Sequence, residues 1–308
     1  MAERIFFIVN PRSANGRTGQ GWAERQRVLA QALGEFGVGM TEGALHAGQL
    51  AREALAQGYT RIVAVGGDGT LNEVLNGFAS PTGLTAEGSA LGYLPSATGG
   101  DLARTLGIAG QGLDGLIDRL RRDTPRALDC GCAVFRGPTG AEVTRLFMNE
   151  ASIGFSADTV DAVNRSSKAL GGKASFALGV LRCLAGLKNH VLSVTVDGQP
   201  FHEGGAFLLA ISNGKYFGGG MMIAPQARPD DGLLDLVLLA PLSRLQVARH
   251  MGKIYKGDHL MLPEVFLGSG KRIEVRSPED VLLEMDGEQP GKLDAVLSLL
   301  PGQIPFLL

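Results

Sequence analysis

A glycine-rich segment follows a short apolar run in the first part of the chain. The run is Ile62-Val63-Ala64-Val65, and the residues after it are Gly66-Gly67-Asp68-Gly69-Thr70-Leu71-Asn72-Glu73. A strand that ends in a glycine turn and then enters a helix presents backbone N–H groups and a helix N-terminus to a phosphate. Because a carboxylate repels phosphate, we expect Asp68 to hold a metal, a water or a hydroxyl. The four residues Gly66–Gly69 alone are equally typical of an ordinary strand-to-helix turn.

Two further groups of carboxylates could do chemistry. Asp286 and Glu288 are two positions apart, which places them on one face if the backbone there is extended. Close carboxylates raise each other's pKa, and this helps one of them to act as a base. The alternative is an exposed hairpin tip, since Asp-Gly is a common turn. Asp230-Asp231-Gly232 offers hard oxygen atoms of the kind that Mg²⁺ prefers, although alone it is also typical of a plain turn.

The elements that must position these residues alternate between strand and helix over the first 125 residues or so. Apolar runs predict strands at Ile5–Asn10, Val38–Thr41, Arg61–Val65 and Ala90–Leu94. Helical patterns fall between them, at about 21–36, 49–57, after Thr70 and from Asp101. This rhythm favours a doubly wound, Rossmann-like parallel sheet with the site at the strand C-termini.

Past Arg126 the pattern changes to short β-like runs bounded by Gly, Pro and Asp. They predict a second, mainly antiparallel β domain, a sandwich. We therefore divide the chain into an α/β domain at 1–127 that carries the glycine-rich segment, a β-rich domain at 128–295, and a segment at 296–308 that packs back on the first domain.

Composition limits the function classes. The 308 residues carry a net charge of −2, so no overall field favours nucleic acid. Two local basic clusters, Arg119–Arg126 and Arg244–Lys256, are typical of solvated helix faces or of contact with anionic lipid head groups. The N-terminal apolar run is too short for a signal peptide, no run is long enough to span a bilayer, and three cysteines suggest core thiols. We expect a cytoplasmic protein.

Taken together, the motifs resemble those of bacterial lipid kinases of the diacylglycerol kinase family, along nearly the whole chain. Sphingosine kinases and NAD kinases share the Gly-Gly-Asp-Gly-Thr string. Asn10-Pro11-Arg12-Ser13, with Ala14 after it, is similar to the family's nucleotide-contacting Asn-Pro-x-Ser loop, and Thr41 stands where the family has a nucleotide-contacting Thr. The segment Leu94–Arg104, which contains Thr98, resembles Pro-x-Gly-Thr-x-Asn-Asp-Phe-Ala-Arg. Here Ala97 and Gly100 replace the family's Gly and Asn.

The second half carries the resemblance further. Asn149–Phe155 is similar to the strand that opens the family's second domain, and Gly218–Asp235 resembles its structural magnesium segment. The resemblance implies Mg²⁺ ligands at the carbonyls of Arg228 and Leu233 and the carboxylate of Asp231. Met285-Asp286-Gly287-Glu288 matches the family's Asp-Gly-Glu, which supplies the catalytic carboxylates, and we favour Asp286 as the base with Glu288 second.

The resemblance implies an ATP-dependent lipid kinase that phosphorylates a hydroxyl of a membrane lipid, either diacylglycerol or a related glycerolipid or sphingoid lipid. It implies ATP bound at the residues from Asn10 to Ala14, Thr41, Gly66–Glu73 and Thr98, Mg²⁺ as cofactor, and peripheral contact with the membrane. A homodimer is also considered. The alternatives are an NAD kinase and a non-catalytic protein that senses nucleotide or lipid, the latter prompted by Ala97 and Gly100.

Overall fold

The chain forms two compact units. The structure is a computed structural model, and it describes residues 4–80, 82–84, 87–96, 100–165 and 183–308. One unit comprises Met1–Asp129 with Gly302–Leu308, and the other comprises Cys130–Pro301. The boundary follows Asp129, and the C-terminal return to the first unit begins at Gly302 instead of 296.

A parallel sheet forms the centre of the first unit. Its strands are β1 (Ile5–Val9), β2 (Gly37–Met40), β3 (Arg61–Gly66) and β6 (Ala90–Pro95), in the order β2-β1-β3-β6. The end of β17 (Glu288–Leu307) adds to β6, also in parallel, through Phe306 opposite Leu91. The predicted parallel sheet is confirmed. Its inner strands are continuous apolar runs because helices cover both faces.

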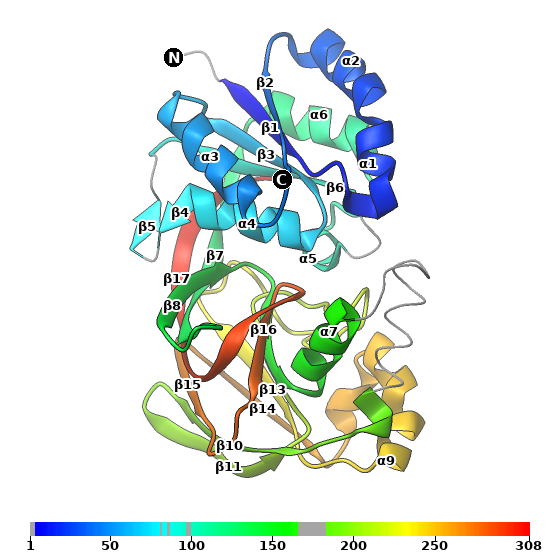
Figure 1. Cartoon of the computed structure of the whole chain (residues 1–308), viewed down its shortest axis with the longest axis vertical. Coiled ribbons are helices and arrows are strands. Elements are labelled where there is room, and N and C mark those ends of the chain that lie inside the picture. Colours follow the sequence, from blue (N-terminus) through cyan, green and yellow to red (C-terminus); the bar gives the residue numbers. More distant parts are fainter. Residues whose placement is uncertain (1–3, 81, 85–86, 97–99, 166–182) are drawn as a thin grey trace. The chain divides into compact units, whose positions relative to one another are not determined.

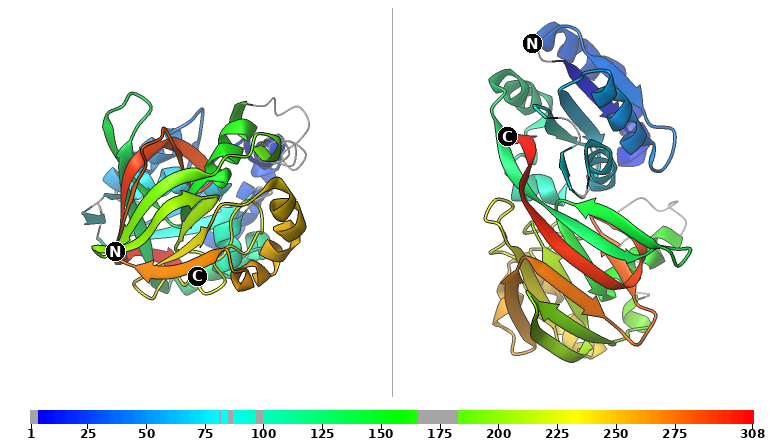
Figure 2. Two further views of the ribbon diagram at one scale, coloured as in Figure 1. Left: turned by 90° about the horizontal axis from the view of Figure 1, so that it is seen from below. Right: turned by 90° about the vertical axis from the view of Figure 1, so that its left-hand side faces the viewer.

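The helices of the first unit are α1 (Arg17–Gln20), α2 (Trp22–Leu33), α3 (His46–Ala56), α4 (Asp68–Phe78), α5 (Asp101–Thr105) and α6 (Gly112–Arg122). A short 3₁₀ turn, η1 (Ser13–Gly16), precedes α1, and the small hairpin β4 (Ala79–Ser80) and β5 (Gly83–Leu84) follows α4. Helices α2 and α6 cover one face of the sheet, where Phe7 and Val63 pack against Trp22 and Leu116. Helices α3 and α4 lie against the other face (Figure 1, Figure 2).

Antiparallel strands form the second unit. One layer has the order β14 (Val265–Gly270), β13 (Leu234–Leu239), β12 (Leu208–Ser212), β9 (Glu150–Gly154), β16 (Leu282–Met285) and β17. Another layer is built from β11 (Gln199–Ala206), β10 (His190–Val196), β15 (Arg272–Arg276), β17, β7 (Pro125–Arg136) and β8 (Glu142–Phe147). The strand β17 belongs to both layers. Because neighbouring strands in these layers run antiparallel, the predicted antiparallel β domain is confirmed.

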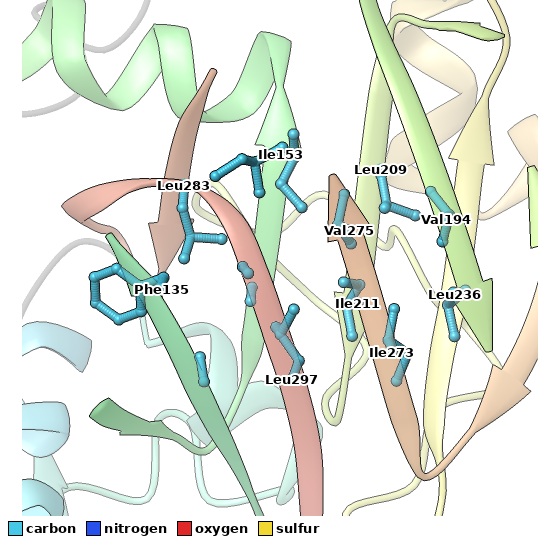
Figure 3. Close-up of a cluster of buried hydrophobic side chains, with 14 of the residues drawn as sticks. Phe135, Ile153, Val194, Leu209, Ile211, Leu236, Ile273, Val275, Leu283 and Leu297 are labelled. Atoms are coloured by element: carbon cyan, nitrogen blue, oxygen red, sulfur yellow. The ribbon is translucent and has the colours of Figure 1, made fainter. Parts of the chain in front are cut away.

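The core of the second unit lies between these layers, as Figure 3 shows. Side chains from opposite layers meet there, among them Phe135, Ile153, Leu209, Val275 and Leu283. The outer face of the β14-β13-β12-β9-β16 layer carries α7 (Phe155–Arg165), α9 (Arg244–His250) and the 3₁₀ turns η3 (Met251–Tyr255) and η4 (Asp258–Met261). None of the helices within the described ranges is both long and apolar enough to cross a bilayer.

Two glycines allow α3 and α4 to approach closely, and this contact predicts a stability effect. A Cβ atom on Gly77 would lie 2.1 Å from the carbonyl oxygen of Gly48. We expect Gly77→Ala to lower the free energy of unfolding by about 2–3 kcal/mol, because backbone cannot move aside cheaply. Thermal or urea unfolding measures this change.

The matched control is Gly43→Ala, since a Cβ on Gly43 meets nothing within 4 Å and the backbone is not left-handed. This variant should stay within about 0.5 kcal/mol of the parent. Equal destabilisation by both substitutions would contradict the close helix contact.

Candidate active site

The glycine turn leads from β3 directly into α4. Gly67 is the N-cap residue of α4, and no side chain caps the helix. The first turn of a helix leaves N–H groups without helical acceptors, so this terminus can offer them to an anion. A Cβ on Gly66 would lie 2.4 Å from Thr70 Oγ1, which explains why a glycine is needed there. The turn therefore has a geometry that could accept a phosphate group.

Asp68 joins this turn to the loop after β6. Its carboxylate accepts N–H bonds from Gly100 (2.9 Å) and Asp101 (3.1 Å), and the Tyr93 hydroxyl donates to it at 3.2 Å. Burial raises the pKa of the Asp68 carboxyl, while the two N–H bonds act in the opposite direction. The sequence predicted a metal, a water or a hydroxyl as the partner of Asp68, and the hydroxyl of Tyr93 is present. The two N–H bonds were not foreseen, and they make Asp68 an anchor for the neighbouring loop.

The loop after β1 lies beside the glycine turn. Asn10 Nδ2 donates to Thr70 Oγ1 at 3.0 Å, and Asn10 Oδ1 accepts the Arg12 N–H at 3.0 Å. Ser13 Oγ donates to the Asn10 carbonyl at 2.9 Å. The structure therefore brings Asn10–Ser13 and Thr70 together. Ala14 has a left-handed backbone, with φ of 53°, a conformation that non-glycine residues seldom adopt.

Several predicted nucleotide-binding residues have structural contacts of their own. Leu71 and Asn72 are buried, and Asn72 accepts hydrogen bonds from Asn76 Nδ2. Glu73 Oε2 accepts the Ala47 N–H at 3.1 Å, at the start of α3, where no side chain of α3 supplies a cap. Thr41 is buried at the end of β2, and Thr98 lies outside the described residues.

The backbone conformation of Gly100 explains how this chain can have glycine where the family pattern has asparagine. Its φ is 75°, in the left-handed region that glycine and asparagine adopt most readily. Glycine at this position keeps the backbone conformation that an asparagine could also provide, and its N–H holds Asp68. What is lost is the side-chain amide.

In the second unit, Asp286 occupies a tight turn and is buried. Of the two backbones that the sequence left open, the hairpin is present and the extended one is not: Met285 pairs with Glu288, and Asp286 and Gly287 form a two-residue turn with φ of 47° and 86°. The Asp286 carboxylate accepts N–H bonds from Met148 (3.0 Å), Asn149 (3.0 Å) and Glu150 (3.1 Å). The hairpin alternative is thus correct in geometry, but of the two residues at its tip only Gly287 is exposed, whereas Asp286 is buried.

Glu288 has a different partner. Its Oε2 forms an ion pair with Arg145 of β8 at 2.5 Å. The carboxyl groups that interact with Asp286 electrostatically are instead Glu150 and Glu284, both buried. The two carboxylates of the Asp-Gly-Glu string are therefore held in separate environments.

The predicted magnesium segment is a loop between β12 and β13. Asp231 Oδ1 accepts the Leu233 N–H at 3.1 Å, and Arg228 pairs with Asp230 at 3.7 Å. Burial and the nearby charge of Asp231 raise the pKa of Asp235 to about 6. Two acidic side chains with backbone carbonyls are a suitable donor set for a hard cation, which would relieve the repulsion between them. No cluster of three or more His, Cys, Asp or Glu side chains suited to a metal occurs in the described part of the chain.

Sequence reasoning missed four residues of these sites: Tyr93, Glu150, Asp235 and Glu284. Tyr93 and Asp235 lie within or beside strings that the sequence singled out, so their positions gave a usable signal. Glu150 lies within the string Asn149–Phe155 and Glu284 directly precedes Met285–Glu288, but neither string marks these two carboxyl groups as neighbours, because only the pairing of β9 with β16 brings them together.

Comparisons with known proteins agree with this fold. The family model of the diacylglycerol kinase catalytic domain matches residues 4–133, and that of the "YegS C-terminal NAD kinase beta sandwich-like domain" matches residues 149–308. The protein named "Probable lipid kinase YegS-like" of Pseudomonas aeruginosa is 30% identical over 305 residues, covering 98% of this chain and 93% of that one. The diacylglycerol kinase of Bacillus subtilis is 27% identical over 292 residues, covering 94% and 91%.

Solved structures show the same fold. A Bacillus anthracis protein described as a candidate diacylglycerol kinase has a TM-score of 0.80 at 25% identity, over 99% of this chain and 95% of that one. Yeast NADH kinase, solved with NADH, has a TM-score of 0.50 at 13% identity, over 99% and 82%, and shares the fold alone. With two family models covering both units and a 30% identical relative along its length, the chain belongs to the diacylglycerol kinase family of lipid kinases.

Proposed function

We propose that this protein is an ATP-dependent kinase that phosphorylates a hydroxyl of a membrane lipid, diacylglycerol or a related glycerolipid or sphingoid lipid. The observation that carries the proposal is the uncapped glycine turn between β3 and α4 in a chain that also holds the buried Asp286 turn. Phosphoryl transfer needs a cradle for the polyphosphate and a carboxylate that accepts the hydroxyl proton. We assign the cradle to the glycine turn and the carboxylate to Asp286.

ATP is the phosphate donor in this proposal, with its phosphates at Gly66–Thr70. The backbone N–H groups of the α4 N-terminus suit a polyanion. The loop Asn10–Ser13, joined to Thr70 by the Asn10 amide, supports the same place. Asp68 acts there through the loop it anchors, and its own charge need not face the phosphates.

Asp286 is the proposed base. Three backbone N–H bonds fix the direction of its carboxylate, so the group that would take the proton is held in place. Glu288 is the second candidate for the base. It is less buried than Asp286, but one of its carboxylate oxygens is already paired with Arg145. In this assignment the turn supplies orientation, and orientation is a large part of the rate in phosphoryl transfer.

The first test is transfer of the ATP γ-phosphate to diacylglycerol in mixed micelles, with NAD as the competing acceptor. We expect Asp286→Asn to lower kcat by about 10²–10⁴-fold with little change in the KM for ATP, because it keeps the shape and removes the basicity. Circular dichroism and the unfolding midpoint report whether the turn survives the substitution.

Glu288→Gln is the matched variant, and it should lower kcat less. If only Glu288→Gln lowers kcat, the two roles are exchanged. Phosphorylation of NAD without lipid phosphorylation would replace the proposal with an NAD kinase, and ATP binding without transfer to either would make the protein a sensor.

Magnesium is proposed at the loop between β12 and β13, held by the carbonyls of Arg228 and Leu233 and the carboxylate of Asp231. The support is the Asp231–Asp235 pair, whose mutual repulsion a cation would lower. When bound, the ion would order this loop by linking backbone on both sides of Asp231.

Asp231→Ala should therefore raise the magnesium concentration that gives half-maximal activity, beyond what chelation by ATP explains. A titration with free Mg²⁺ at fixed ATP measures this, with Asp118→Ala, an exposed carboxylate of α6, as the control. Identical titrations for Asp231→Ala and the parent would exclude the metal site.

Contact with an anionic bilayer is proposed for the segment from α9 to η4. Leu245 is 80% exposed and Met261 is 88% exposed. Leu245 and Arg249 are four positions apart on α9, so they share its outward face, opposite the buried Val247. Neither Arg244 nor Arg249 forms an ion pair within the described residues. Unpaired basic groups beside exposed apolar side chains suit a negatively charged lipid surface.

Cosedimentation with vesicles tests this contact. The double variant Leu245→Ser, Arg249→Gln should bind phosphatidylcholine/phosphatidylglycerol vesicles at least about tenfold more weakly, from lost apolar burial and one lost charge. Val191→Ser removes an exposed apolar side chain of β10 and should bind as the parent does. Equal binding by the double variant, or equal binding to vesicles without phosphatidylglycerol, would contradict the proposal.

The homodimer stays a prediction, which sedimentation equilibrium can test.

A further inference from the structure

Two buried carboxyl groups lie directly behind the Asp286 turn. Glu150 of β9 is 3% exposed and Glu284 of β16 is 2% exposed, and the two strands are neighbours in the sheet. Glu284 lies opposite Ser152 in this pairing, and Glu150 precedes Ser152 by two residues in β9, so both side chains are on the same face of neighbouring strands. Two ionised carboxylates placed in this way in a buried region would repel each other, and neither forms an ion pair with a basic side chain among the described residues. One member of the pair must therefore be a neutral acid.

The contacts of each side chain show which member carries the proton. Glu284 accepts the Gly287 N–H through Oε1 at 2.6 Å, and Ser152 Oγ donates to its Oε2. These are the contacts of an anion. Glu150 Oε2, in contrast, is buried without a hydrogen-bond partner among the described residues. Glu150 is thus the member of the pair that stays protonated.

The electrostatics point the same way. Burial raises the pKa of both side chains. That of Glu150 is raised well above its ordinary value, because the charges of Glu284 and Asp286 add to the effect of burial. Charged groups on the adjoining elements are Asp235 of β13, Asp158 of α7 with its partner His190, and Glu288 with its partner Arg145.

Both members of the pair also hold the Asp286 turn. Glu284 binds the N–H of Gly287, the second residue of the turn. The main chain of Glu150 brackets Asp286 itself: its N–H donates to Asp286 Oδ1 at 3.1 Å, and its carbonyl accepts the Asp286 N–H at 3.0 Å. A change in the charge of this pair therefore alters the contacts that hold the Asp286–Gly287 turn.

We propose that Glu150 and Glu284 share a single proton and act as positioning residues that hold the Asp286–Gly287 turn in its working geometry. The positioning role rests on the proposed function, whereas the shared proton does not. Loss of that proton puts a third negative charge into a buried region that already holds Glu284 and Asp286. The repulsion between these carboxylates then increases, and the turn that both residues contact loosens.

The sign of the pH dependence follows. An acid whose pKa is higher in the folded protein than in the unfolded chain stabilises the fold fully below its unfolded pKa. That stabilisation is lost as the pH rises through the folded pKa. Glu150 should accordingly make the protein less stable as the pH rises above about 4.5, by up to a tenfold change in the unfolding constant per pH unit.

The test is urea unfolding of the full chain between pH 5 and 9, which needs no kinase activity. Glu150→Gln keeps the shape of the side chain and cannot ionise, so its unfolding constant should change less steeply with pH than that of the parent. It should equal or exceed the parent in stability at pH 8. Glu284→Gln removes the anion and should be less stable than the parent at every pH. The control Glu142→Gln, an exposed carboxylate of β8, should follow the parent.

The positioning role is measured in the same variants by the pH profile of lipid phosphorylation. Glu150→Gln should keep kcat near neutral pH within about threefold and extend activity to higher pH, whereas Glu284→Gln should lower kcat at least tenfold at every pH. Parent-like pH dependence of unfolding in Glu150→Gln, or equal effects of the two variants, would overturn the shared proton. The predicted unfolding behaviour without lipid kinase activity would support the pair and contradict the proposed function.

Discussion

Both candidate sites depend on a carboxylate that accepts backbone N–H bonds from another part of the chain. Asp286 accepts three of them, from Met148, Asn149 and Glu150, and Asp68 accepts two, from Gly100 and Asp101. A buried charge without such partners would cost several kcal/mol. With them, each carboxylate determines the course of a loop that the sheets leave undefined. Glu73 makes the same kind of contact, because its carboxylate accepts the Ala47 N–H at the start of α3.

Acidic residues in these motifs can have two roles: they can contact the substrate, or they can hold backbone in place. A side chain that contacts substrate can be replaced with little effect on the fold, whereas one that organises backbone cannot. Asp68 and Glu73 belong to the second kind on the contacts described, and Asp231 has a lighter local contact to Leu233. Asp286 combines both roles in the account given above, which is why its surroundings, Glu150 and Glu284 included, bear on the chemistry.

Much of the fold could be predicted from the sequence, because buried parallel strands are short apolar runs and Ile62–Val65 is one of them. The glycine turn was predictable for a similar reason, since only glycine fits beside Thr70 at position 66. The turn at Asp286 was not assigned, because Asp-Gly suits both a hairpin and an extended site. Its N–H partners lie 136 or more residues away in the chain, and strand pairing alone brings them close. Glu150 and Glu284 were missed because their importance arises only when β9 and β16 pair.

The most direct measurement of the central claim is amide hydrogen exchange with and without a non-hydrolysable ATP analogue and Mg²⁺. If the glycine turn binds the phosphates of ATP, exchange should slow in peptides that cover residues 10–14 and 66–73, with no comparable change in β10 or β11, which the account gives no role in binding. Slowed exchange elsewhere in the first unit, with residues 66–73 unchanged at saturating nucleotide, would contradict the account.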